Sequence, residues 1–146
     1  MNILAAIDFS PVTEQVLQAL ERIGTSMAAH VWLVHVAPPD PDFVGYGTGP
    51  EGVRSQVAVE HRERHRELQA HADRLRTAGV ETTALLLQGA TVDTLMAEAG
   101  RLSAALIVLG SHGHGRIYDM VVGSVAEGVV RVSSLPVLLV PAQRAT

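Results

Sequence analysis

The chain contains neither cysteine nor lysine, and each absence excludes a class of chemistry. With no cysteine among its 146 residues, it cannot form a disulfide, use a thiol nucleophile or hold a metal with thiolates. All 11 of its lysine or arginine positions are arginine. A P-loop needs a lysine that reaches the β- and γ-phosphates, and a Schiff base needs a lysine amine. Neither mechanism is open to this protein.

A strong charge and a long apolar run are also missing. The formal net charge is −4 at pH 7, which offers no basic surface for nucleic acid or for an anionic membrane. No apolar run reaches the roughly 18 residues that a transmembrane helix needs. The first residues, MNILAAI, lack the basic region of a signal peptide. We therefore expect a cytoplasmic protein with no nucleic-acid partner and no membrane contact.

Apolar strand-like segments alternate with helical segments along the chain. Near-continuous apolar runs, typical of strands covered on both faces, occupy residues 2–8, 30–37, 80–87, 104–109 and 136–140. Helical spacing of apolar residues is found at residues 10–28, 56–78, 91–102 and 123–132. Ser10 is suited to cap the first helix and Gly79 to end the second. The alternation predicts an α/β fold, a doubly wound open sheet of parallel strands with helices on both faces, as one domain over residues 1–146.

Two further stretches carry weaker signals. His61 and His65 lie one helical turn apart on the stripe that includes Leu68, so we expect partly buried packing histidines. Their sequence, HRERH, is not the metalloprotease motif H-E-x-x-H. Residues 38–55 hold four prolines and four glycines, which predicts a loop, either a lid over a ligand or a mobile insertion.

A glycine-rich segment follows the fourth predicted strand. Residues 109–128 read LGSHGHGRIYDMVVGSVAEG, and the last helix opens at the Gly-Ser pair. Glycines let backbone N–H groups approach a ligand oxygen closely. The free N–H groups at a helix start favour an anion, and His112, His114 and Arg116 can add donors. The segment is therefore a candidate phosphate cradle.

The predicted sheet brings other residues to this segment. Ligands of doubly wound sheets bind beyond the carboxyl ends of the strands, so Asp8 and Val36 are expected there as well. A carboxylate at that place suits ribose hydroxyls, or a metal that bridges to phosphate. The residues thus favour a nucleotide over a bare anion. The simpler alternative is a glycine-rich surface loop followed by a helix that Ser124 caps.

The pattern Gly110-x2-Gly113-x9-Gly123-Ser124 resembles the ATP-binding signature of the universal stress protein family. The resemblance extends over the chain, from ILAAIDFSP through VWLVHVAPP and AALIVLGSHGHG to SSLPVLLVP. It implies five parallel strands in the order 3-2-1-4-5, as in the adenine nucleotide alpha hydrolase-like group, and an ATP site. The residues that it places along the nucleotide are Ala6, Ile7, Asp8, Val36, Leu109, Gly110, His112, Gly113, His114, Gly115, Arg116, Gly123, Ser124 and Val125.

By the same resemblance, Asp8 lies on the ribose, the backbone of Val36 contacts the adenine, and residues 112–116 wrap the phosphates. Mg²⁺ or Mn²⁺ would be held mainly by those phosphates. Ala126 departs from the pattern, because some ATP-binding members carry a hydroxyl residue there. A protein-bound metal on His112 and His114 is less favoured, since catalytic zinc usually has three protein ligands.

The resemblance implies a nucleotide-dependent stress-response or signalling module that hydrolyses ATP slowly at most. It also implies a homodimer through residues 136–141, and an unknown protein partner. The alternative is a true enzyme, an adenine-nucleotide phosphohydrolase or phosphotransferase, in which His112 or His114 would stabilise charge. A nicotinamide-dependent Rossmann enzyme is excluded, because the first strand-to-helix turn has no glycine trio.

Overall fold

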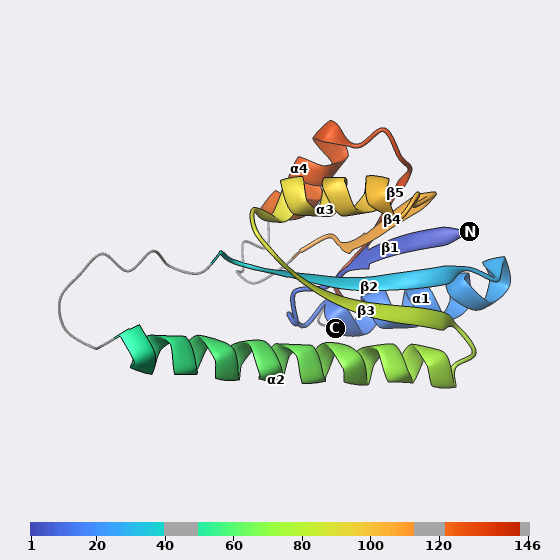
Figure 1. The fold of residues 1–146 in the computed structure, drawn as a ribbon. Helices are drawn as coiled ribbons and strands as arrows, with labels where there is room; N and C mark the ends of the chain where they lie inside the picture. The colour runs from blue at the N-terminus through green and yellow to red at the C-terminus, as the bar shows by residue number, and fades with distance from the viewer. Residues whose placement is uncertain (40–49, 113–121, 144–146) are drawn as a thin grey trace.

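A computed structural model describes residues 1–39, 50–112 and 122–143 and contains a five-stranded sheet (Figure 1). Its strands are β1 (Asn2–Ala6), β2 (His30–Ala37), β3 (Glu81–Gln88), β4 (Leu106–Gly110) and β5 (Val137–Val140). All neighbouring strands are parallel, in the order β3-β2-β1-β4-β5. The predicted doubly wound sheet and its strand order are confirmed.

The helices cover both faces of the sheet. They are α1 (Thr13–Met27), α2 (Pro50–Thr77), α3 (Thr91–Arg101) and α4 (Ser124–Val132). In Figure 1, α1 and α2 lie on one face, and α3 and α4 lie on the other. This arrangement follows from the parallel order, because each strand-to-strand crossover must pass over one face of the sheet. No helix within the described ranges is long and apolar enough to cross a membrane.

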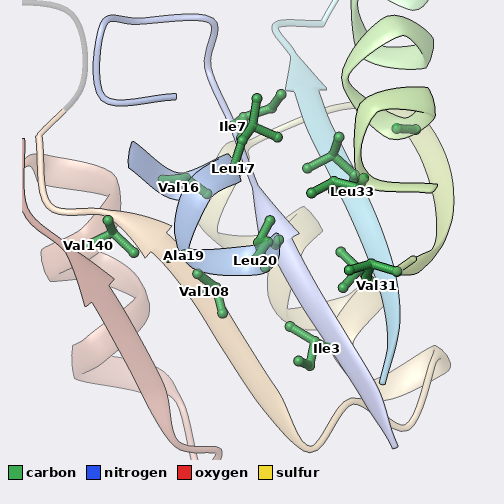
Figure 2. Close-up of a cluster of buried hydrophobic side chains, with 14 of the residues drawn as sticks. Ile3, Ile7, Val16, Leu17, Ala19, Leu20, Val31, Leu33, Val108 and Val140 are labelled. Carbon is green, nitrogen blue, oxygen red and sulfur yellow. The ribbon is translucent and has the colours of Figure 1, made fainter. Parts of the chain in front are cut away.

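Each face of the sheet has its own buried cluster. On the α1 side, Val16, Leu17 and Leu20 pack with strand residues that include Ile3 and Leu33 (Figure 2). The opposite cluster joins Leu4, Val34 and Ile107 of the strands to Leu95 and Ala99 of α3 and to Ala126 and Val129 of α4. Successive strand residues point to opposite faces. Two covered faces therefore require apolar residues at every position, which explains the unbroken apolar runs of the sequence.

The first helix begins later than predicted, and Ser10 does not cap it. Helix α1 starts at Thr13, whose N–H donates to the backbone oxygen of Ser10 at 3.0 Å. The hydroxyl of Ser10 is buried without a hydrogen-bond partner in the described part of the chain. The reason lies one residue earlier, where Phe9 takes a left-handed φ of 57° and the Asp8 carboxylate accepts the Ser10 N–H at 3.0 Å. The chain therefore turns once more before the helix begins.

The second helix is longer than predicted. Helix α2 begins at Pro50, six residues before the expected start at residue 56, and proline is well suited to the first helical position. Residues 40–49 of the predicted loop lie outside the described residues. The helix ends as predicted, because Gly79 takes a φ of 90°, and the N–H of Val80 returns to the oxygen of Leu75 at 2.9 Å.

The buried stripe of α2 differs from the prediction at one histidine. Leu68, Ala72 and Leu75 are fully buried, and His61 is half-buried as expected. His65, however, is exposed, so the prediction is wrong there. The half-buried residue one turn before Leu68 is Arg64, because the helical period of 3.6 residues carries the stripe from position 68 to position 64. An arginine thus stands where the sequence suggested a histidine.

Candidate functional site

The carboxyl ends of three adjacent strands form one edge of the sheet. Ala6, at the end of β1, is in register with Val34 of β2 and with Leu109 of β4. The pairing continues one residue further, because the Ile7 N–H donates to the oxygen of Val34 at 2.9 Å. Asp8 therefore leaves the sheet between β2 and β4. Val36, half-buried, lies two residues further along β2.

The start of α4 is tied to the same edge. The Ser111 N–H donates to the oxygen of Val140 at 2.8 Å, and the Gly123 N–H donates to the oxygen of Ser111 at 2.6 Å. The first intrahelical bond of α4 runs from the Glu127 N–H to the oxygen of Gly123 at 2.9 Å. The N–H groups of residues 124–126 therefore have no partner within the helix. They open beside the carboxyl end of β4, where the helix dipole favours an anion.

The predicted site residues can now be placed. Ala6, Ile7 and Asp8 lie at the end of β1, Leu109 and Gly110 end β4, and His112 follows them. Gly123 is the N-cap of α4 in an extended conformation, and no side chain caps the helix. Ser124 and Val125 are exposed in its first turn. Four of the predicted phosphate contacts lie outside the described residues, namely Gly113, His114, Gly115 and Arg116.

Gly110 has a packing reason that sequence patterns did not indicate. A Cβ at this position would lie 2.5 Å from Cγ1 and 3.1 Å from Cγ2 of Val12. Val12 is buried at the start of α1 and holds that helix against the end of β4. The glycine therefore allows the close approach of a helix as well as any approach of a ligand.

A cavity of about 290 Å³ opens beside Asp8. It lies between the turn after β1 and helix α2, and its lining residues are Asp8, Phe9, Glu60, Glu63, Arg64 and Glu67. None of the α2 residues of this set was predicted as a site residue from the sequence. Their spacing of three to four residues marks one helical face, but only the packed structure places that face beside Asp8.

A buried histidine lies next to this cavity. The Nδ1 atom of His35 is 2.8 Å from the backbone oxygen of Ile7, and Nη1 of Arg64 is 3.0 Å from Nε2 of His35. Arginine can only donate, so Nε2 accepts and Nδ1 carries the proton that is donated to Ile7. Burial lowers the pKa of His35, and the Arg64 charge lowers it further against the opposing hydrogen bond to Ile7. His35 is therefore neutral at pH 7, with its tautomer set by two partners.

The metal alternative finds no built site in the described part of the chain. No three His, Asp or Glu side chains gather there in a group that could hold an ion. His112 is engaged locally, since its Nδ1 atom lies 2.8 Å from the hydroxyl oxygen of Ser111. The other histidine of that alternative, His114, lies outside the described residues.

A family model described as the Universal stress protein family matches residues 1–141. This chain belongs to the universal stress protein family. Among curated relatives, it is 30% identical over 139 residues to "Universal stress protein in QAH/OAS sulfhydrylase 3'region" of Thermus aquaticus, covering 95% of this chain and 97% of the relative. It is 31% identical over 140 residues to "Universal stress protein A homolog 1" of Coxiella burnetii, with 95% and 94% covered.

Solved universal stress proteins share the fold of this one. Protein MJ0577 of Methanocaldococcus jannaschii superposes with a TM-score of 0.82 at 22% identity, covering 99% of this chain and 97% of that one. UspA of Lactobacillus plantarum gives a TM-score of 0.81 at 19% identity, with 96% and 97% covered. At these identities the likeness establishes the fold of this universal stress protein and leaves its ligand to be argued from its own residues.

Proposed function

We propose that this universal stress protein binds ATP at the carboxyl edge of its sheet and acts as a nucleotide-dependent stress-response or signalling module. The observation that carries the proposal is the bond from Gly123 to Ser111, which holds the open N-terminus of α4 beside β4. An anion site and the Asp8 carboxylate thus lie at one edge. Two relatives support an adenine nucleotide. One, from Archaeoglobus fulgidus, is described "in complex with dAMP", and the other "in complex with cAMP".

The residues divide by the part of the nucleotide that their chemistry suits. The carboxylate of Asp8 accepts hydrogen bonds from ribose hydroxyls, while the backbone of residues 6–7 and Val36 lie along the adenosine. Leu109 and Gly110 flank the ribose. The phosphates lie at the start of α4, at Gly123, Ser124 and Val125, and against residues 112–116. Mg²⁺ or Mn²⁺ bound mainly by the phosphates would neutralise part of their charge.

We expect slow ATP hydrolysis from the catalytic groups that the chain contains. Fast phosphoryl transfer needs cations on the transferring group and a residue that orients the nucleophile. The metal ion and Arg116 would supply positive charge, but the chain has no P-loop lysine and offers no evident base to orient a water. ATP would then act by binding one state of the protein better than another. We place this activity in the cytoplasm, with a protein partner that reads the nucleotide state.

The edge strand β5 is the proposed dimer contact. It stands last in the sheet order and has only four residues, Val137–Val140. An edge strand presents unpaired backbone groups that a second copy can pair with. Beside it, Val130 and Val132 of α4 are exposed. We therefore propose a homodimer through residues 136–141, which sedimentation at micromolar concentration tests. A monomer there would remove the claim.

Calorimetry with ATP, ADP and AMP in the presence of Mg²⁺ tests the site. Asp8→Asn keeps the oxygen that accepts the Ser10 N–H and removes the charge, so we expect a folded protein with roughly tenfold weaker binding. Asp93→Asn makes the same change at an exposed position of α3 and should leave affinity unchanged. Phosphate release from the same samples separates a binding module from an enzyme. No binding by the wild type would refute the ATP assignment, and rapid turnover would replace it with the phosphohydrolase.

A further inference from the structure

A chain of two hydrogen bonds joins helix α2 to the segment that follows β1. Arg64 donates from Nη1 to Nε2 of His35 at 3.0 Å, and His35 Nδ1 donates to the Ile7 oxygen at 2.8 Å. His35 is buried, with 5% of its surface exposed. The His35 ring therefore links the Arg64 side chain of α2 to the backbone carbonyl of Ile7. That carbonyl belongs to the residue before Asp8.

The turn that holds Asp8 also makes one aromatic contact with β2 and one with α2. The Phe9 ring lies 4.6 Å from the His35 ring and 6.1 Å, in a stacked orientation, from the ring of His71 on α2. Phe9 has a φ of 57°, a left-handed conformation that L-residues adopt only when their surroundings hold them there. The Phe9 ring therefore contacts both β2 and α2, so the turn that holds Asp8 is packed against both elements.

Arg64 is half-buried and lies one turn before the first fully buried residue of α2. The fully buried residues of the helix begin at Leu68, and residues 58–60 are exposed, including Val59 at 45%. Figure 1 shows the first turns of α2 extending past the carboxyl ends of the strands. Among the α2 side chains whose burial is described, the fully buried apolar ones, Leu68, Ala72 and Leu75, all lie in the second half of the helix. Closer to the carboxyl edge of the sheet, the hydrogen bond from Arg64 to His35 holds α2 against β2.

We propose that Arg64 is a positioning residue of the nucleotide site. Through His35, it fixes the Ile7 carbonyl and the Asp8 turn in the conformation that binds ribose. Because coupling between two sites is reciprocal, a nucleotide on Asp8 in turn stabilises the Arg64 contact and the projecting half of α2. The second statement rests on the proposed function. The first is a property of the nucleotide-free protein.

Amide hydrogen exchange on the nucleotide-free protein tests the linkage first. Arg64→Ala removes the donor, and we expect exchange in residues 7–12 to become about tenfold faster, the size of one hydrogen bond of about 1.4 kcal/mol. Arg62→Ala is the matched control, because Arg62 is exposed on the same helix. The ¹⁵N shifts of the His35 ring should report the Nδ1–H tautomer in the wild type and change only in the Arg64 variant. Equal exchange in both variants would overturn the linkage.

His35→Asn separates positioning from charge. The asparagine amide can donate to the Ile7 oxygen as Nδ1 does, but it offers Arg64 no ring nitrogen, and the net charge at pH 7 stays the same. We expect His35→Asn and Arg64→Ala each to weaken ATP binding about tenfold, and the double variant to be no weaker than either. Additive losses, or a loss in Arg64→Ala alone, would refute action through His35 and indicate simple attraction of the phosphates.

Hydrogen exchange and ATP binding test the Arg64 linkage and the proposed function separately. If the wild type binds no adenine nucleotide, the proposed function and the role of the linkage in binding both fail. Exchange in residues 7–12 then still decides whether Arg64 holds the turn. If the wild type binds ATP and Arg64→Ala binds it equally well, the proposed function stands and the positioning role is refuted.

Discussion

Replacing Gly110 by alanine should destabilise the protein through a single contact. The new Cβ would sit 2.5 Å from Cγ1 of Val12, about 1 Å closer than carbon atoms approach without repulsion. Val12 cannot swing aside easily, because a β-branched side chain is stiff at χ1 and this one is 5% exposed. The start of α1 must therefore move away from β4. Overpacking of this kind costs about 1–3 kcal/mol.

Urea unfolding followed by circular dichroism measures this loss, and a double variant identifies its cause. Val12→Ala alone should lose about 1.5 kcal/mol with its two methyl groups. In Gly110→Ala/Val12→Ala the clash is gone, so the combined loss should be smaller than the sum by about 1 kcal/mol or more. Gly100→Ala is the control, because a Cβ there meets nothing within 4 Å, and it should be neutral or slightly stabilising. Losses that add within about 0.5 kcal/mol would refute the packing argument.

Two further predictions concern charged groups. Arg74 donates to Glu14 and to Glu21, both at 2.7 Å, so Arg74→Ala should lower the free energy of unfolding by about 1 kcal/mol at pH 7 and low salt. The bond to Arg74 holds the pKa of Glu14 below its ordinary value. The Glu14 part of this contribution is present at neutral pH and is lost as pH falls through that lower pKa, so urea titrations should give a smaller stability difference between the two proteins at about pH 3 than at pH 7. An unchanged difference would contradict this. Burial lowers the pKa of His35, so acid protonates the unfolded chain first, and wild-type stability should fall as pH drops below about 6.5. His35→Asn should show a flatter profile between about pH 5 and 7, and parallel curves would contradict the assignment.

Much of the fold could be read from local patterns. The apolar run of residues 30–37 became β2 with the predicted bounds, and Gly79 ended α2 as expected. Both features depend on neighbouring residues along the chain, such as a pleated strand covered on two faces or a backbone angle that glycine adopts freely. The start of α1 could not be read this way. It depends on the left-handed backbone of Phe9 and on the Asp8 carboxylate that accepts the Ser10 N–H. The Phe9 ring lies against His71 of α2, a contact that no short-range pattern indicates.

Some residues of the candidate site could be predicted from the sequence, and others could not. Asp8, Val36 and Gly123 could be expected at one edge, because parallel strands end together and a helix start follows a glycine. The cavity beside Asp8 could not, since Glu63, Arg64 and Glu67 are identified only by the way α2 crosses the sheet. Charged residues occur on more than one face of α2, so the sequence does not indicate which face lies beside Asp8.

The sequence alone determined the alternation of strands and helices, the two-sided burial of the sheet, and the sheet edge at which the candidate site lies. These properties follow from residue type and short-range spacing, which fix backbone conformation and which side chains avoid water. The tertiary structure alone decided that Val12 occupies the space above Gly110, and that Arg64 reaches Ile7 through His35. Such contacts join residues far apart in the chain, and they depend on helix position to within about 1 Å, because protein interiors are close-packed.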